Sequence, residues 1–266
     1  MIPLKDYNPT TRFAWVTLLL IGACLWVYFV VQPSGQSGFV DPSPEEQGEE
    51  IEWTVRHAAI PCELVQGRPL TERELIQTFA QGDTTACTDT PRGVSFAEDK
   101  NVYLAALWSI FLHGGLLHLA GNMLFLWVFG NNIEDRLGPV AFIAFYVVGG
   151  VVATLAHVML EPDSTVPVVG ASGAIAAVMG AYLVLFPNAR ILSFVPIFFF
   201  GFLAEISAKW LLGFWFVSQF FISPNSGVAW AAHVGGFAFG VLVALALRDR
   251  LRPPRRDLAY PMPPPY

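Results

Sequence analysis

Charged side chains are scarce in this chain. Only 14 % of its 266 residues are Asp, Glu, Lys or Arg, whereas 54 % are hydrophobic, and the mean hydropathy is +0.52. Soluble domains usually carry roughly 25 % charged residues. The composition therefore excludes an ordinary soluble domain and indicates an integral membrane protein.

Sequence motifs for metals, nucleotides and repeated architectures are also absent. The chain has no glycine-rich phosphate loop, and His113 and His118 have a five-residue spacing that does not place them on one helical face. The lack of internal repeats argues against a small-solute transporter built from two related halves. We therefore predict no metal, no cofactor and no nucleic-acid partner.

The apolar residues are concentrated in six long runs. These runs are Phe13–Val31, Leu116–Phe129, Val140–Leu160, Gly170–Phe186, Leu203–Phe221 and Val228–Leu247. Most of them approach the ~20 residues that a helix needs to cross the hydrocarbon core of a bilayer. The sequence therefore predicts an all-α membrane protein, a bundle of six transmembrane helices with a long outer loop between the first and second spans.

The distribution of Lys and Arg predicts the orientation of these spans. The side that holds both termini carries most of these residues, whereas the two short loops on the other side, Glu161–Val166 and Ser223–Gly227, carry none. Because short loops rich in Lys and Arg stay in the cytoplasm, both termini are predicted to be cytoplasmic. Since no transit peptide is apparent, we expect a multi-pass protein of a bacterial plasma membrane.

These spans divide the chain into five regions. They are a cytoplasmic N-terminus over 1–12, the first transmembrane helix over 13–31, an extracytoplasmic loop over 32–107, a core over 108–247 and a basic, proline-rich cytoplasmic tail over 248–266. The loop contains one helical candidate, Thr71–Gln81. Cys62 and Cys87 also lie in this loop, where they either form a disulfide or remain two free thiols.

Four polar residues occur at similar depth in the predicted spans. His118 and Asn122 lie near the start of the second span, Ser172 near the start of the fourth and His233 a few residues into the sixth. These three spans run in the same direction, so the four side chains share the outer half of the bilayer. Polar groups at that depth are costly, and their presence points to a functional site that opens to the outer side.

Ser172 and His233 suit nucleophilic acyl transfer. His233 would take the proton of the Ser172 hydroxyl and later return it to the leaving amine. His118 and Asn122, which share a helical face, would hold the oxyanion together with the unpaired backbone N–H of Ser172. No Asp or Glu lies at matching depth, so we predict a dyad rather than a triad.

Two stripes of small residues would allow the fourth and sixth spans to approach closely. The stripes are Gly173, Ala177 and Ala181 in the fourth span and Ala232, Gly236 and Gly240 in the sixth. Such stripes let helix backbones come into contact. Because one stripe begins beside Ser172 and the other beside His233, the pattern predicts that these two residues meet.

Together these motifs resemble the rhomboid intramembrane serine proteases. The matching segments are Phe111–His113, His118–Leu119, Asn122–Met123, Gly130–Gly138, Gly170–Ala174 and Ala232–Phe237. The resemblance covers residues 108–247 and implies an endopeptidase that cleaves single-span membrane proteins within the lipid bilayer, without metal or cofactor. It implies that Ser172 is the nucleophile, His233 the general base, and His118 and Asn122 parts of the oxyanion site.

The resemblance also implies three further roles, with two departures from the family pattern. Glu134 and Arg136 resemble a structural brace, the outer loop nearest the core would support the fold at the membrane boundary, and the fifth span would be a lateral gate. Ser109 stands where the family often has arginine. Ala176 stands where an aromatic ring commonly stacks on the catalytic histidine, so His233 needs an aromatic partner from the fifth or sixth span.

A proteolytically inactive rhomboid-like protein that binds membrane clients is the alternative function. Such a protein has no need for a serine and a histidine at the same depth. The retention of both Ser172 and His233 therefore favours the protease.

Overall fold

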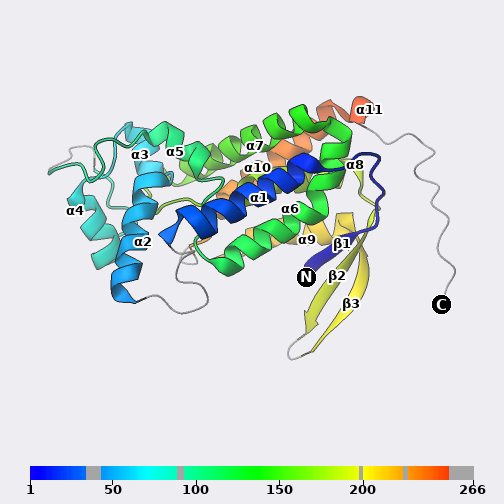
Figure 1. Cartoon of the computed structure of the whole chain (residues 1–266), viewed down its shortest axis with the longest axis horizontal. Coiled ribbons are helices and arrows are strands. Elements are labelled where there is room, and N and C mark those ends of the chain that lie inside the picture. Colours follow the sequence, from blue (N-terminus) through cyan, green and yellow to red (C-terminus); the bar gives the residue numbers. More distant parts are fainter. Residues whose placement is uncertain (34–42, 89–92, 198–199, 224–226, 252–266) are drawn as a thin grey trace.

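The computed structural model describes residues 1–33, 43–88, 93–197, 200–223 and 227–251 (Figure 1). The proline-rich tail expected beyond residue 251 lies outside the described residues. The long helices form one elongated body, with short helices at one end and three strands at the other (Figure 1).

The apolar runs of the sequence are largely helical. The helices are α1 Trp15–Trp26, which continues as the π-helical turn η1 Val27–Val31, then α6 Leu116–Leu137, α7 Pro139–Leu160, α8 Ser172–Leu185, α9 Ala208–Gln219, α10 Trp230–Ala246 and the short α11 Arg248–Leu251. In the described part of the chain, α6 and α7 are the two helices long and apolar enough to cross a membrane, and α1 with η1, α8 and α10 are shorter apolar helices. The mainly helical fold is confirmed.

Helix α8 lies at the centre of this body. All of its residues from Gly173 to Tyr182 are buried, and it packs against α6, α7 and α10. A helix that is apolar on every face is expected to be buried on every face. Its alanine and glycine residues keep α8 thin, so that several neighbours approach it at once.

Helices α8 and α10 meet through their backbones. A Cβ atom placed on Gly240 of α10 would lie 1.9 Å from the carbonyl oxygen of Ala177, and one placed on Gly236 would lie 2.2 Å from that of Gly173. These residues belong to the two small-residue stripes, so the predicted close approach is confirmed. Any side chain at either glycine requires the two helices to separate.

Gly240→Ala is expected to displace α10 from α8, because the new Cβ would overlap the Ala177 carbonyl oxygen. Overpacking of this kind costs about 1–3 kcal/mol, measurable as a lower Tm of the detergent-solubilised protein. Gly22→Ala in α1 is the control, since no atom lies within 4 Å of a Cβ there, and its Tm should be unchanged or slightly higher. Equal Tm values for the two variants would contradict the close contact.

The all-α prediction is wrong in one region, where three strands form a sheet. Strands β1 Ile2–Asp6, β2 Arg190–Ile197 and β3 Phe200–Ser207 pair antiparallel in the order β1-β2-β3 (Figure 1). Because aromatic and β-branched residues favour strands, a short apolar run does not distinguish a strand from a helix. Helix α9 therefore begins at Ala208, after the strand, and not at Leu203 as predicted.

A buried carboxylate at the end of α6 holds the start of α1. Glu134 accepts hydrogen bonds from the backbone N–H groups of Val16 and Thr17 and from the Thr17 hydroxyl, at 2.7–3.0 Å. These N–H groups lie in the first turn of α1, where a helix supplies no partners of its own. The expected brace therefore does not join Glu134 to Arg136. Glu134 binds the start of α1, and the Arg136 guanidinium lies 3.7 Å from the Asp135 carboxylate.

The segment expected to be a long loop contains a small folded unit. Its helices are α2 Pro44–His57, α3 Pro61–Gln66, α4 Glu72–Leu75 with the π-helical turn η3 Ile76–Ala80, and α5 Val102–Trp108. We call the described residues from 43 to 108 the disulfide unit. Helices α3, α4 and α5 have seven residues or fewer and leave little periodicity in a sequence. Helix α2 has 14 residues, but it is rich in Glu and has few apolar residues to form a pattern, so only the candidate over 71–81 was predicted.

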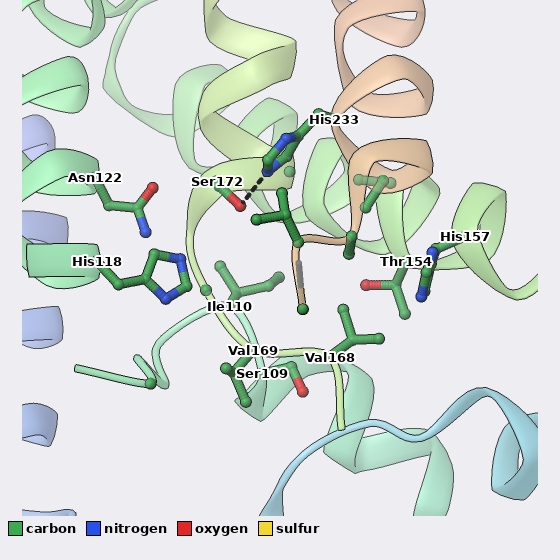
Figure 2. Close-up of a pocket in the computed structure, with 18 of the residues that line it drawn as sticks. Ser109, Ile110, His118, Asn122, Thr154, His157, Val168, Val169, Ser172 and His233 are labelled. Carbon is green, nitrogen blue, oxygen red and sulfur yellow. Dashed lines mark hydrogen bonds between the residues drawn. The ribbon is translucent and has the colours of Figure 1, made fainter. Parts of the chain in front are cut away.

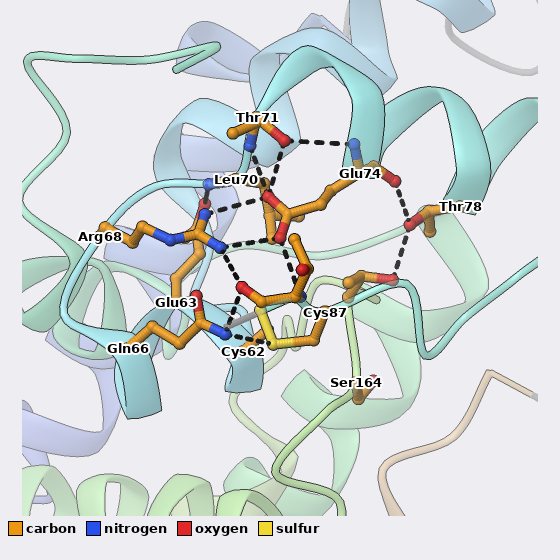
Figure 3. Close-up of a disulfide and its surroundings, with 12 residues drawn as sticks. Cys62, Glu63, Gln66, Arg68, Leu70, Thr71, Glu74, Thr78, Cys87 and Ser164 are labelled. Atoms are coloured by element: carbon orange, nitrogen blue, oxygen red, sulfur yellow. Dashed lines mark hydrogen bonds and ion pairs between the residues drawn. A yellow bond between two sulfur atoms is a disulfide. The ribbon is translucent and has the colours of Figure 1, made fainter. Parts of the chain in front are cut away.

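The disulfide unit has its own small core. A disulfide joins Cys62 to Cys87, which confirms the first of the two alternatives for these residues (Figure 3). Cys62 packs with the buried side chains of Val55, Ile60 and Leu70. So few apolar side chains bury little surface, and a cross-link compensates for a small core by restricting the unfolded chain.

Glu74 is the centre of a hydrogen-bond network beside the disulfide (Figure 3). Its carboxylate accepts bonds from the Arg68 guanidinium at 2.8 and 3.0 Å, from the Thr71 backbone N–H and hydroxyl at 2.8 Å, and from the Thr88 N–H at 3.1 Å. Burial by itself would raise the pKa of Glu74. The hydrogen bonds, with that of Arg68 the strongest, outweigh burial and lower the pKa to about 2.

The disulfide unit is expected to lose stability in acid. A carboxylate whose pKa falls from 4.5 to about 2 on folding stabilises the fold above its unfolded-state pKa, and the contribution is lost as the pH drops from about 5 to 2. The shift corresponds to about 3 kcal/mol. Hydrogen exchange within the unit at about pH 6 and pH 3 measures the loss.

Glu74→Gln should reduce protection at pH 6 and remove most of its dependence on pH. Glu72→Gln is the matched control, because Glu72 is exposed and its loss should leave the pH dependence intact. If Glu74→Gln lost protection in acid as steeply as the wild-type protein, another group would be responsible.

Candidate active site

Ser172 and His233 meet at one end of the helical body. Ser172 is the first residue of α8 and His233 lies in the first turn of α10. The Ser172 Oγ atom lies 2.8 Å from His233 Nε2, which is hydrogen-bond distance (Figure 2). The backbone contact between α8 and α10 starts beside this pair and brings the two side chains within reach.

Gly170 shapes the segment that leads into Ser172. Its φ of +125° lies in a region that other residues rarely adopt. A Cβ atom at this position would also lie 2.8 Å from the His118 ring. Backbone conformation and space therefore both require glycine two residues before the serine.

Ser109 connects the segment before Ser172 to the disulfide unit. Its backbone carbonyl oxygen accepts a hydrogen bond from the Gly170 N–H at 2.9 Å, and its hydroxyl accepts one from the Ala59 N–H at 2.7 Å. The Val168 N–H adds a third bond, to the Ala59 carbonyl oxygen at 2.8 Å. The residue that departs from the family pattern thus has a structural role here, and one of these bonds uses its hydroxyl.

His118 and Asn122 of α6 point from the opposite side toward the segment of Ser172 (Figure 2). Asn122 is 7 % exposed, and its Nδ2 atom is buried with no hydrogen-bond partner among the described residues. Buried donors are normally paired, and an unpaired one is costly. A donor left unpaired at the wall of a cavity is suited to an oxygen atom of a ligand.

All four residues predicted from the sequence line one cavity of about 1070 Å³. The cavity continues past Ser172 to Thr154 and His157 of α7 (Figure 2). Within the described residues there is no cluster of three or more His, Cys, Asp or Glu side chains that could hold a metal ion. The polar side chains that line this cavity are hydroxyls, the imidazoles of three histidines, the Asn122 amide and the Glu161 carboxylate.

Helix α9 adds two contacts to His233. Gln219 Oε1 lies 2.7 Å from His233 Nδ1, and the Trp215 ring lies 5.7 Å from the imidazole, tilted by 41°. Trp215 confirms the expected aromatic partner from the fifth run, while Ala176 is fully buried in the core. Sequence reasoning missed Gln219. The available signal was a polar residue in an apolar run, four positions after a tryptophan.

The class that this fold and cavity define is a mainly helical protein with apolar helices of membrane-spanning length and a serine–histidine contact, and comparison with known proteins gives its family. The family model described as the Rhomboid domain matches residues 100–250. The chain is 33 % identical over 145 residues to the presenilin-associated rhomboid-like protein, mitochondrial, of Bos taurus. It is 34 % identical over 147 residues to Rhomboid protein 1, mitochondrial, of Saccharomyces cerevisiae, and 32 % identical over 173 residues to the rhomboid protease GluP of Bacillus subtilis. The chain belongs to the rhomboid family.

The three matches cover 51, 52 and 60 % of this chain, but only 36, 40 and 30 % of the respective relatives. The range of the family model, residues 100–250, includes helices α6 to α10. These matches show the family of this chain.

The expected location in a bacterial plasma membrane is contradicted by this comparison. The relatives in cattle and yeast are both named as mitochondrial proteins. The prediction rested on the apparent lack of a transit peptide, which does not identify a membrane. The length and hydropathy of the spans could not correct it, because bilayer thickness differs by only a few Å between membranes. The prediction of cytoplasmic termini and of a site that opens to the outer side assumed a bacterial plasma membrane, so these two assignments are withdrawn as well.

Proposed function

We propose that this protein is a serine endopeptidase that cleaves transmembrane helices of single-span membrane proteins. The observation that carries the proposal is the 2.8 Å contact between Ser172 Oγ and His233 Nε2 inside a large cavity. The rhomboid family acts on membrane-protein substrates, and its relative in Bacillus subtilis is named a protease. The proposed chemistry needs neither metal nor cofactor.

In the proposed reaction, Ser172 attacks the carbonyl carbon of the scissile peptide bond. His233 Nε2 accepts the hydroxyl proton as the new C–O bond forms and the carbonyl electrons move to oxygen. When this intermediate collapses, the C–N bond breaks and the histidine donates its proton to the leaving amine. Water then repeats the same steps on the acyl-serine and releases the second product.

The negative oxygen of the intermediate would be held by three kinds of donor. The backbone N–H of Ser172 lies at the start of α8, where N–H groups have no helical partner and the helix dipole is positive. The His118 ring and the unpaired Asn122 Nδ2 line the same cavity from α6. Donors aimed at developing charge before the reaction begins lower the barrier without a reorganisation cost.

We propose that the first apolar helix with its π-helical turn and the helices α6 to α10 form six membrane spans. Helix α8 has 14 residues and is therefore about 21 Å long, which is shorter than the ~30 Å hydrocarbon core. Its first residue, Ser172, would then lie below the membrane surface. This depth is what a protease needs to reach a peptide bond inside a substrate helix.

Ser172→Ala and His233→Ala should each abolish cleavage, because each removes one half of the proton-transfer pair. Loss of a member of such a pair typically lowers kcat by at least about 10³-fold. The assay uses purified protein in detergent with a fluorescently labelled single-span substrate. Ser207→Ala is the matched control, because the Ser207 side chain makes no capping hydrogen bond at the start of α9.

The same experiment decides between the protease and a client-binding protein. Cleavage that persisted in Ser172→Ala would exclude Ser172 as the nucleophile. If the wild-type protein bound single-span substrates across a broad panel and cleaved none of them, the client-binding function would be the better description.

Asn122→Ala should lower kcat by about 10²- to 10³-fold, as loss of one oxyanion donor does in other enzymes. KM should change little and Tm should not fall, since Nδ2 has no partner within the described protein and its removal breaks no bond. Steady-state kinetics and thermal unfolding of the same preparation measure both effects. A large drop in Tm would instead assign Asn122 a structural role.

A further inference from the structure

The side chain of Gln219 connects α9 to His233. Its Oε1 atom lies 2.7 Å from His233 Nδ1. Its Nε2 atom donates to the backbone carbonyl oxygen of Trp215 at 2.9 Å and to the Ser218 hydroxyl oxygen at 3.3 Å. Gln219 is only 4 % exposed, so water has little access to this amide.

These contacts determine which way the Gln219 amide faces. A backbone carbonyl oxygen only accepts hydrogen bonds, so the group that faces Trp215 O must be the NH₂. The amide oxygen therefore faces His233, and it too can only accept. The hydrogen bond at 2.7 Å consequently requires the proton of the neutral imidazole to be on Nδ1.

A proton on Nδ1 leaves Nε2 without one. Nε2 can then accept the hydrogen bond of the Ser172 hydroxyl at 2.8 Å, which is the state that a general base requires. The opposite tautomer would direct an N–H at Ser172 and could take no proton from it. We propose that Gln219 is a positioning residue that holds His233 in the Nδ1-protonated tautomer, and its effect on catalysis rests on the proposed protease function.

The face of α9 that carries Gln219 also contacts the His233 ring through Trp215. Trp215 and Gln219 are four residues apart and thus neighbours on one helical face. The Trp215 ring lies against His233, and Gln219 fixes its proton. Because the Gln219 amide is neutral, it holds the Nδ1 proton without placing a buried carboxylate beside the histidine. His233 therefore has its working orientation and tautomer only while α9 lies against α10.

The test compares Gln219→Leu, which removes the acceptor, with Gln219→Glu, which keeps acceptor oxygens at the same reach. Val217→Ala, at an exposed position of α9, is the control. The first measurement is the ring ¹⁵N spectrum of His233 in ¹⁵N-histidine-labelled full-length protein, assigned by comparison with His233→Ala. We expect the single Nδ1–H signature in the wild-type and control proteins and a mixture of tautomers in Gln219→Leu.

The second measurement is the cleavage rate in detergent. Gln219→Leu should lower kcat by about 10- to 100-fold, with KM and Tm nearly unchanged. This decrease in kcat is smaller than the ~10⁴-fold decrease that follows loss of the carboxylate partner in a Ser-His-Asp triad. Gln219→Glu should recover most of the rate.

An unchanged His233 spectrum in Gln219→Leu overturns the inference, and so does an unchanged kcat in a protein that requires Ser172 for cleavage. If no cleavage occurred in the wild-type protein, the proposed function would fall, and the spectrum alone would decide the role of Gln219.

Discussion

The backbone contact between α8 and α10 is the constraint on which the rest of the structure depends. Gly236 and Gly240 let α10 approach the carbonyl oxygens of Gly173 and Ala177 so closely that no side chain fits between them. Without a hydrophobic driving force between helices in lipid, such close packing is a main source of helix association. It also determines the distance between Ser172 and His233, so stability and the candidate chemistry share one contact.

The cavity around this contact is built at some cost to stability. Asn122 keeps a buried donor without a partner, and Gly170 keeps a backbone conformation that most residues avoid. An unpaired buried donor alone costs about 1–3 kcal/mol. Unfavourable features of this kind are typical of functional sites, where the position of a group suits a ligand and does not stabilise the fold. The extensive burial of α8 offsets it.

The disulfide unit is connected to the segment that precedes Ser172. Its small core and the Cys62–Cys87 bond hold it together, and Ser109 joins it by hydrogen bonds to the segment before Ser172. A segment expected to be a long loop therefore contacts the segment before Ser172, and its Gly82 and Thr84 line the cavity. Its Glu74 carboxylate, with a pKa lowered to about 2 by hydrogen bonds, belongs to the same unit.

The sequence by itself determined the apolar helices, the two small-residue stripes and the four polar residues of the cavity, because periodicity and polarity are properties of single segments. It did not reveal the sheet, since short apolar runs suit strands and helices equally.

The sequence also did not reveal the partner of Glu134 or the roles of Ser109 and Gln219. These depend on which side chains meet across elements distant in the chain. Only the tertiary structure decides such contacts, because the geometry of packing, and not the local pattern, brings Gln219 of α9 within 2.7 Å of His233.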